Sequence, residues 1–412
     1  MSNLKVSNIQ NLNIFLISIL PLGLIIGSLI SNSIIILICV FFLLDLFVRK
    51  NLFFLNQFNF YFLLLINIYL ILNSYFVSEN EESIIKSFGF VRFIILVYAI
   101  PYYFTLSENK ILKIWTLFFL VVSFDILFEY IFGKNIFGSQ SIYPGRISSF
   151  TGDELKIGGY YFGFILLSLF YLKQYKKNFF LLFSIIFFVI SLLIGERSNF
   201  LKVFIMYSLF FMFFYNISFL KKFLIIFFLF FTSVFLISSI PILKSKFIYH
   251  IIDKELVKNL KEKDKKIDYK NIISKNIHLN HYYNAIGIFK ENILFGSGFK
   301  SFRIESYKNM GKDDNIIVPS SHPHQFHFEI LSELGLVGYI LIFSNLIYLL
   351  FRKFNYEKEL VRTGALLFVI ASLVPILPSG SFFTSYGATI FFINYSFLIR
   401  PNDLNKIKNY SE

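Results

Sequence analysis

The sequence predicts an all-helical protein that crosses a membrane many times. Of its 412 residues, 56% are hydrophobic and only 16% are charged, and the mean hydropathy is +0.66. Soluble domains carry about 25% charged residues, so this composition is typical of a membrane protein. Apolar runs recur along the chain, and a helix of about 20 apolar residues spans the hydrocarbon layer of a bilayer. We therefore expect a polytopic transmembrane helical bundle.

About twelve apolar runs, most of roughly 16 to 22 residues, are candidate spans. They are centred on residues 13–30, 33–48, 59–76, 84–104, 111–131, 157–172, 179–194, 200–216, 223–240, 335–351, 365–377 and 382–399. The first run lacks a small-residue cleavage site, which indicates a retained span rather than a removed signal peptide. We expect nine transmembrane helices with short loops in 1–240, one large extracytoplasmic loop in 241–334 that precedes the third-last span, and the last three helices with a cytoplasmic tail in 335–412.

The basic residues predict the orientation of the chain. Most of them fall on one set of connections: Lys5, Arg49, Lys50, Lys110, Lys113, Lys173, Lys176, Lys177, Lys221, Lys222, Arg352, Lys353, Lys358, Arg362, Arg400, Lys406 and Lys408. By the positive-inside rule that side is cytoplasmic. The large loop then lies outside, because loops longer than about 60 residues cross the membrane regardless of charge. Its Lys-rich stretch 253–275 is expected to be a solvated helix or mobile surface, and the net charge of +14 reflects orientation rather than nucleic-acid binding.

Arginine is scarce, which makes its positions informative. Only eight of the 39 basic residues are Arg, and the topology places Arg92, Arg146, Arg197 and Arg303 in the outer leaflet or outside. The planar guanidinium fork suits carboxylate and phosphate groups, so these residues are candidate anion-binding groups. The alternative is internal pairing with nearby acidic residues, and binding and pairing can coexist. The candidate partners are Asp125, Glu129, Glu154 and Glu196.

Three polar stretches support an outward-facing site. The connection 133–159 is rich in Gly and carries Arg146 and Glu154, and a polar segment of this length rarely serves only as a tether. The stretch 195–198, Gly-Glu-Arg-Ser, predicts a tight turn that holds Arg197 at the membrane face. The stretch 281–303 ends in a Gly-Ser-Gly turn followed by Arg303, although such a turn alone is weak support for phosphate binding.

Three of the six histidines, His322, His324 and His327, lie where the polar loop re-enters an apolar run. Pro323 suits the first turn of a helix, and Phe326, Ile330 and Leu334 follow at helical spacing, with polar residues on the other faces. His324 is thus expected at a helix start on the membrane surface. A zinc site is an alternative, but no cysteine lies nearby, and the single Cys39 also excludes a disulfide framework. Interfacial histidines without a chemical role are a further alternative.

This segment resembles the O-antigen ligase and O-antigen polymerase superfamily of polytopic bacterial glycosyltransferases. The ligase pattern is His, then Asn, Ser or Gln, nine residues, Gly, two residues, and then Gly, Thr or Tyr. Here His324 and Gln325 are followed by nine residues, Gly335, two residues and Gly338. The stretches 145–159, 195–200 and 378–383 are also similar to members of this superfamily, and the resemblance covers the chain from about residue 84 onward.

The resemblance implies a transfer, without metal or cofactor, of glycan from undecaprenyl diphosphate to an acceptor hydroxyl, at the outer face of the bacterial inner membrane. The expected partners are the carrier-linked glycan, a lipid A-core or glycan acceptor, and membrane lipids. His324 is the expected base, and Arg197 and Arg303 are expected to stabilise the diphosphate leaving group. The expected substrate-binding residues are Arg92, Arg146, Glu154, Gln325 and Glu329.

Three functions remain open at the level of sequence. The histidine pattern favours a ligase, and a polymerase that extends a carrier-linked repeat is the alternative within the enzyme class. A lipid-glycan flippase or transporter is the alternative of another class. Transporters carry charged groups near the midplane of the membrane and often contain internal repeats, whereas this chain concentrates its polar groups on one side and has no repeat that we detect.

Overall fold

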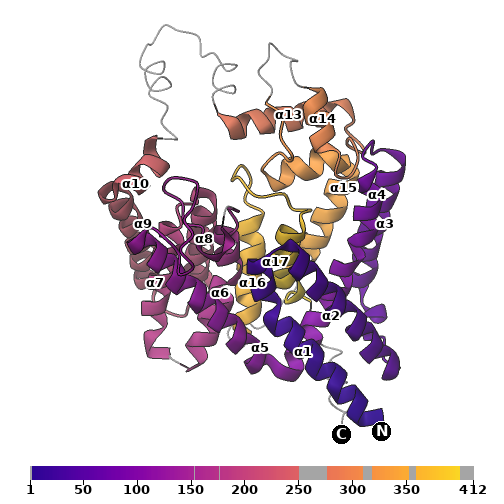
Figure 1. Cartoon of the computed structure of the whole chain (residues 1–412), viewed down its shortest axis with the longest axis horizontal. Helices are drawn as coiled ribbons and strands as arrows, with labels where there is room; N and C mark the ends of the chain where they lie inside the picture. The colour runs from indigo at the N-terminus through magenta and orange to yellow at the C-terminus, as the bar shows by residue number, and fades with distance from the viewer. Residues whose placement is uncertain are drawn as a thin grey trace.

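The computed structural model describes residues 2–152, 154–175, 177–249, 276–309, 318–351 and 359–399, and all regular elements in these ranges are helices (Figure 1). The predicted all-helical class is confirmed. The Lys-rich stretch 253–275 and the tail beyond 399 lie outside the described residues. The α-helices are α1 (Ser2–Ile26), α2 (Ser28–Val48), α3 (Phe58–Phe76), α4 (Glu82–Gly89), α5 (Val91–Phe132), α6 (Ile157–Tyr175), α7 (Phe180–Leu193), α8 (Arg197–Leu209), α9 (Phe219–Ser239), α10 (Pro241–Lys244), α13 (Ile277–Glu291), α14 (Phe302–Lys308), α15 (Phe326–Leu350), α16 (Leu360–Ser372) and α17 (Ser385–Ser396).

Seven helical segments in the described ranges are long and apolar enough to cross a membrane: Ser7–Ile26, Ser28–Val48, Phe58–Phe76, Glu82–Phe132, Arg197–Phe214, Phe219–Ser239 and Phe326–Leu350. The helices α7 and α16 are apolar but shorter. The predicted runs 84–104 and 111–131 are joined in the segment that contains α5, in which Ser107 alone has non-helical angles (φ −152°, ψ 45°). The count of twelve spans and the three-region division therefore stay predictions.

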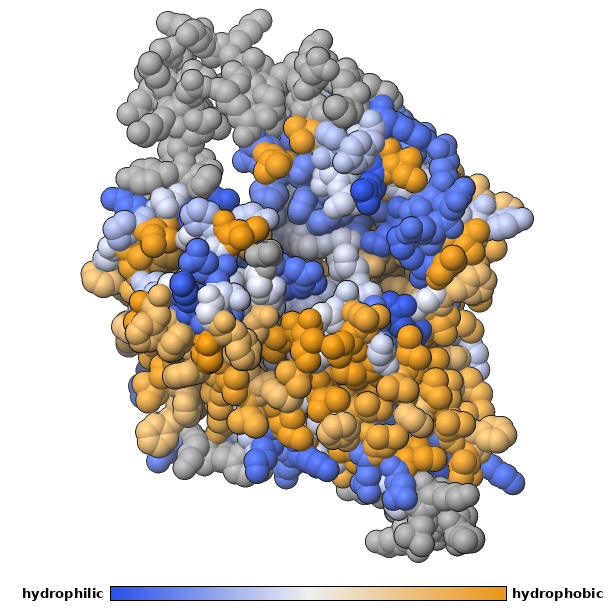
Figure 2. Space-filling view, in the orientation of Figure 1, coloured by the Kyte–Doolittle hydropathy of each residue, from blue (hydrophilic) through white to orange (hydrophobic). Residues whose placement is uncertain are grey.

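The molecule has a broad apolar band with hydrophilic surface above it (Figure 2). Large apolar side chains on α9, such as Phe223, Phe227 and Phe231, are exposed. A spanning helix satisfies its own backbone hydrogen bonds, so its outer face can present apolar side chains such as these to lipid. The helices α13 and α14 lie above the bundle (Figure 1), on the side where Figure 2 shows hydrophilic surface. The structure thus describes a multi-pass membrane protein with a cap on one side.

The helix α15 begins slightly later than Pro323 predicts. Phe326, Ile330 and Leu334 are buried at the predicted helical spacing. Gln325 is the N-cap, and its side chain accepts a hydrogen bond from the backbone N–H of Phe328 at 3.0 Å. His324, just before the cap, has a φ of 57° and lies in the left-handed region. This conformation is incompatible with a helix, so the helix starts only after His324.

A break in α15 connects it to the segment between α13 and α14. Gly335 interrupts the helix with a φ of 65°, and the next two residues donate backbone hydrogen bonds to Ile293 and Leu294 at 2.9 and 3.1 Å. A Cβ atom at position 335 would collide with the carbonyl oxygen of Leu294. On the other side of this contact, Ser297 N–H donates to Ser332 O at 2.9 Å. The Gly-Ser-Gly turn therefore secures the broken helix and fixes the cap above the bundle.

Candidate functional site

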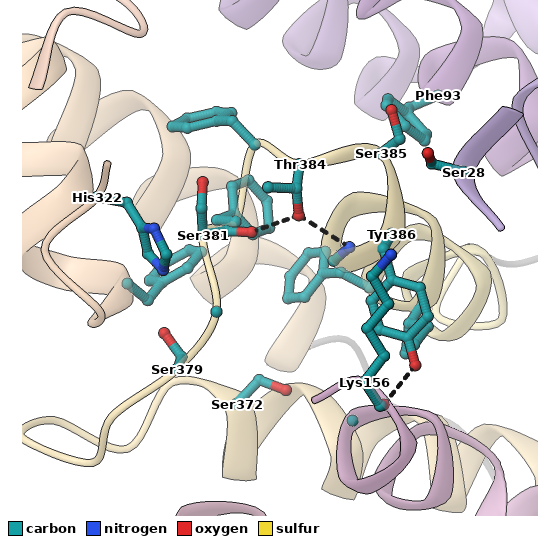
Figure 3. Close-up of a pocket in the computed structure, with 18 of the residues that line it drawn as sticks. Ser28, Phe93, Lys156, His322, Ser372, Ser379, Ser381, Thr384, Ser385 and Tyr386 are labelled. Carbon is teal, nitrogen blue, oxygen red and sulfur yellow. Dashed lines mark hydrogen bonds between the residues drawn. The ribbon is translucent and has the colours of Figure 1, made fainter. Parts of the chain in front are cut away.

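A cavity of about 670 Å³ lies among α5, α6, α8, α15 and α17 (Figure 3). None of the described residues that line it is Asp or Glu. Its positively charged side chains are Lys86, Arg92, Lys156, Lys202 and Lys300, and its hydroxyl groups come mainly from Ser372, Ser379, Ser381, Thr384, Ser385 and Tyr386. Phenylalanine rings form much of the remaining wall. A cavity with cations, hydroxyls and apolar walls suits an anionic amphiphile.

The helix α8 supplies two side chains to the cavity. Asn199 and Lys202 are three residues apart and share one face of the helix. The Lys202 side chain is 4% exposed, and its ammonium group donates to the carbonyl oxygen of Pro378 at 3.2 Å. The hydroxyl of Ser198 also donates to this oxygen. These contacts hold the loop that follows α16 against α8.

Glu329 also holds this loop. Its carboxylate is 1% exposed and accepts hydrogen bonds from the hydroxyl of Ser381 and, at 2.7 Å, from the backbone N–H of Phe382. Lys300 Nζ lies 3.9 Å from Glu329 and donates to Ser381 at 3.1 Å. Glu329 and the N-cap Gln325 are absent from the lining of the cavity. Both expected substrate-binding residues therefore shape the wall rather than face the open space.

Arg92 and Glu154 lie at or near the cavity in different environments. Arg92 lines it and is fixed by hydrogen bonds from Nη1 to Gly89 O at 2.7 Å and from Nη2 to Ser385 Oγ at 3.4 Å. Glu154 forms an ion pair with Lys156 at the edge of the cavity. Of the predicted arginines, only Arg92 therefore lines this space.

His324 lies among three other imidazoles. Its ring centroid is 3.9 Å from that of His322, 5.2 Å from that of His281 and 5.7 Å from that of His278. We call these four residues the histidine cluster. One ring nitrogen each of His278, His281 and His322 is buried without a hydrogen-bond partner in the described structure. In the described ranges, no group of three or more His, Cys, Asp or Glu side chains has an arrangement that holds a metal ion.

His322 places the histidine cluster at the cavity. Its ring lines the space, and Figure 3 shows it across from Lys156 and Tyr386. Its Nδ1 lies 2.9 Å from the hydroxyl of Ser321, which fixes the ring and leaves Nε2 without a partner. His327 is separate from the cluster, because its ring nitrogens bond to Tyr339 and to the carbonyl oxygen of Leu373.

The histidine cluster is neutral at pH 7. Burial, together with the three neighbouring imidazoles, lowers the pKa of His324 to about 3. Burial also lowers the pKa of His278, His281 and His322. Each ring therefore keeps a nitrogen lone pair that can accept a proton. His278 and His281 were not predicted as site residues. Their spacing of three residues, which places both on one face of a helix, could have indicated that they act together.

Arg146 and Arg197 lie near His278, and none of these three residues lines the cavity. Gly195 has a φ of 78°, and a Cβ atom there would collide with the carbonyl oxygen of Gly145, so the two connections pack tightly. The predicted tight turn before Arg197 is confirmed. Arg146 and Arg197 both contribute to the lowered pKa of His278, after burial, which reports their proximity to that ring.

Lys246 adds a third cation to this group. A Cβ atom at Gly145 would lie 3.0 Å from Lys246 Cε, and burial, followed by Arg146 and Arg197, lowers the pKa of Lys246. Within the described ranges, Arg146, Arg197 and Lys246 form no ion pair with a carboxylate. We call these three residues the arginine group. Arg303, by contrast, is exposed on α14, near Glu82, and belongs neither to this group nor to the cavity lining.

The acidic pair on α5 folds a loop rather than pairing with an arginine. Asp125 accepts hydrogen bonds from Ile136 N–H at 2.8 Å and from the hydroxyl of Ser149 at 2.5 Å. Glu129 accepts the backbone N–H groups of Ser148 and Ser149 at 3.2 and 2.6 Å. Both carboxylates therefore fold the connection that carries Arg146. Glu196, another predicted partner, is buried, accepts a hydrogen bond from the Asn199 amide at 2.6 Å and attracts Arg146 without forming an ion pair with it in the described structure.

Part of the site lies within a match to a protein-family model. The family model described as O-antigen ligase matches residues 182–343, a range that includes α8, α13 and the first part of α15. It covers Arg197, Lys202 and all four members of the histidine cluster. A search of curated proteins finds none that matches this chain. This match agrees with the resemblance of the sequence to the O-antigen ligase and polymerase superfamily.

Proposed function

We propose that this chain is a membrane glycosyltransferase that moves a glycan from undecaprenyl diphosphate to the hydroxyl of an acceptor at the outer face of the bacterial inner membrane. The family match supports ligase-type or polymerase-type activity on a lipid-linked glycan. One geometric observation carries the proposal for the site: the histidine cluster runs from the arginine group to the cavity.

The helix α8 separates the two cationic regions. Arg197 and Lys202 are five residues apart, which turns them about 140° from one another around the helix axis. Lys202 lines the cavity, whereas Arg197 belongs to the arginine group. His324 contacts His322 on the cavity side and His278 on the arginine side. A base at this position can accept the proton of an acceptor hydroxyl that arrives from the cavity side. The hydroxyl oxygen can then attack a donor sugar that is bound on the arginine side.

The arginine group is the proposed site of the donor diphosphate. Transfer breaks the bond between the first sugar carbon and a phosphate oxygen, so negative charge grows on the diphosphate. Cations stabilise this charge, and a diphosphate needs no general acid in order to leave. Arg146 and Arg197 offer two guanidinium forks, and Lys246 a point charge, with no competing carboxylate ion pair among the described residues. Arg303 lies in neither cationic region and is assigned no step.

His324 is the proposed base that accepts the proton of the acceptor hydroxyl. Its lowered pKa keeps it unprotonated at pH 7, but a group with a pKa of about 3 is a weak base. A bound diphosphate changes this, because a nearby negative charge favours the imidazolium form and raises the pKa. We therefore expect the bound donor to make His324 a stronger base.

Product analysis tests the proposed activity. Purified protein is reconstituted with glycan-linked undecaprenyl diphosphate, with lipid A-core added or omitted and a chelator present throughout. Glycan joined to lipid A-core identifies a ligase, and lengthening of the carrier-linked chain without core identifies a polymerase. Failure to release carrier with either acceptor contradicts the proposal and favours a flippase or transporter.

A further inference from the structure

The proposed donor site leaves the cavity and most of its cations unexplained. The cavity is separated from the arginine group by α8, and its lining combines five cationic side chains with no described carboxylate. Four of these five cations are lysines, a residue type that the sequence analysis used only to predict the orientation of the chain. These four lysines, Lys86, Lys156, Lys202 and Lys300, come from separate parts of the chain and meet at one cavity. Lysines that only set the orientation of the chain in the membrane would not be expected to gather in this way.

We propose that this cavity is the acceptor site and that the acceptor is a phosphate-bearing lipid. The inference rests on the proposed function, because it assigns the second substrate of that reaction. Two lipids share the required chemistry: a second polyprenyl diphosphate, as a polymerase uses, and a phosphorylated lipid A, as a ligase uses. The experiment below separates them.

Two cations in the lining, the buried Lys202 and the half-buried Arg92, favour an anionic ligand. Lys202 is 4% exposed, and in the described structure it forms no ion pair; its hydrogen bond goes to the carbonyl oxygen of Pro378. Arg92 also lacks an ion pair there, and its Nε is buried without a partner. The carboxylate of Glu196, which does not line the cavity, attracts Lys202 without forming an ion pair with it. A buried charge without a direct ion pair costs free energy, and an anion in the cavity offsets that cost. The three remaining cations have carboxylate partners: Lys86 pairs with Glu82, Lys156 with Glu154, and Lys300 with Glu329 at 3.9 Å.

The walls favour a lipid that carries its phosphate next to sugar or phosphate oxygens. Phenylalanine side chains from α5, α6, α16 and α17 and from the residue before α5 line the apolar part: Phe90, Phe93, Phe162, Phe368 and Phe391. Hydroxyls from the loop before α17 line the polar part, and the Ser379 hydroxyl is buried without a partner (Figure 3). Thr384 and Ser381 lie close together there, joined by a hydrogen bond of 2.8 Å from the Thr384 hydroxyl to the carbonyl oxygen of Ser381.

The histidine cluster places the cavity beside the proposed base. His322 lines the cavity, its Nε2 has no described partner, and its ring centroid lies 3.9 Å from that of His324. A sugar attached to a lipid phosphate held by Arg92 and Lys202 therefore has its hydroxyls near an imidazole. The donor sugar approaches the same imidazoles from the arginine group. The two substrates thus meet at the histidine cluster.

A binding experiment tests the site without requiring turnover. The full chain in nanodiscs is titrated with undecaprenyl diphosphate, with bis-phosphorylated lipid A and with neutral undecaprenol. The cavity variant combines Arg92→Met and Lys202→Met, which replace charge by apolar side chains of similar length. Lys221→Met, an exposed change on α9, is the control. We expect the cavity variant to lose about tenfold or more in affinity for one phosphate lipid and none for undecaprenol.

The identity of the affected lipid decides the acceptor class. Weakened lipid A binding indicates a ligase-type acceptor. Undecaprenyl diphosphate binding that falls from two sites to one indicates a polymerase-type acceptor. Equal binding of all three lipids by wild type and by the cavity variant overturns the inference.

A kinetic experiment separates this inference from the proposed function. In the transfer assay, the cavity variant should raise KM for the acceptor at least tenfold and leave KM for the donor unchanged, whereas Arg197→Met should affect the donor. A raised KM for the donor in the cavity variant overturns the acceptor assignment while transfer itself stands. If wild type transfers nothing, the proposed function fails, and the binding experiment still decides whether the cavity holds a phosphate lipid.

Discussion

At the scale of single residues, the site depends on backbone conformations that few side chains adopt. His324 has a φ of 57°, and its carbonyl oxygen accepts a hydrogen bond from Ser379 N–H at 2.7 Å. The same residue therefore carries the proposed base and holds the loop that lines the cavity. Asn tolerates the left-handed region, whereas Ala there costs about 1–2 kcal/mol. His324→Asn is thus the variant that removes the imidazole with least damage to the backbone.

Arg197→Lys tests whether the donor needs a guanidinium fork. A point charge cannot make two parallel hydrogen bonds to a phosphate, so we expect the rate of transfer to fall by about 100-fold. Turnover by purified variants measures this. Arg49→Lys is the control, because Arg49 pairs with Asp45 through a single 2.9 Å contact at the C-terminal end of α2. Normal turnover of Arg197→Lys would contradict the proposal that Arg197 binds the donor phosphate through two parallel hydrogen bonds.

The histidine cluster predicts a loss of stability in acid. The folded state lowers the pKa of all four imidazoles, and that of His324 to about 3, whereas unfolded His titrates near about 6.5. Between these values the unfolded state binds more protons, so the free energy of unfolding decreases as pH falls from about 6.5 toward 3 and is unaffected at higher pH. Thermal unfolding of wild type and His324→Asn between about pH 7.5 and 4 measures this. The variant should lose less stability, and equal losses would contradict the assignment.

At the scale of helices, the spacing of apolar residues predicted the buried face of α15 but not its start or its break. The burial of Phe326, Ile330 and Leu334 was predicted from their helical spacing alone. The break at Gly335 follows from a distant segment, because only the absence of a side chain lets Leu294 approach so closely. Contacts of this kind depend on how two parts of the chain meet in space, which a local pattern does not encode.

Gly335→Ala tests the break in α15. The φ of 65° and the collision with Leu294 predict a loss of about 1–3 kcal/mol in stability. Gly287→Ala is the matched control, since position 287 lies inside α13 and has open space, with nothing within 4 Å, where a Cβ atom would stand. There Ala should preserve or raise the melting temperature, because it is a better helix former by about 1 kcal/mol. Equal melting temperatures for the two variants would show that the break is not required.

At the scale of the whole molecule, composition predicted the helical membrane class, while the orientation drawn from charge stays a prediction. The site was predicted in part. The scarcity of Arg identified Arg92, Arg146 and Arg197, which lie at two neighbouring regions in the structure. The lysines of the cavity were missed, because Lys is common in this chain and the four converge only after folding. Arg303 was predicted as a site residue because it comes after a Gly-Ser-Gly turn. In the structure that turn contacts α15, and Arg303 does not line the cavity.

Cysteine labelling tests the orientation. Cys39 is buried, so wild type should give little background with a membrane-impermeant maleimide. Gln140→Cys and Asn109→Cys place exposed thiols on the two sides predicted to face outside and cytoplasm. We expect labelling of position 140 in intact cells and labelling of position 109 only after the membrane is permeabilised. The reverse pattern would invert the topology and place the site in the cytoplasm.

The most direct test of the central claim is carrier release by His324→Asn. Wild type and variant are reconstituted with glycan-linked undecaprenyl diphosphate and acceptor, and released undecaprenyl diphosphate is followed over time. We predict that the variant binds donor normally but releases carrier at least about 100-fold more slowly, because the acceptor hydroxyl lacks its base. His327→Gln, which removes an imidazole outside the histidine cluster, should keep release near that of wild type. Release by His324→Asn at the wild-type rate would contradict the account.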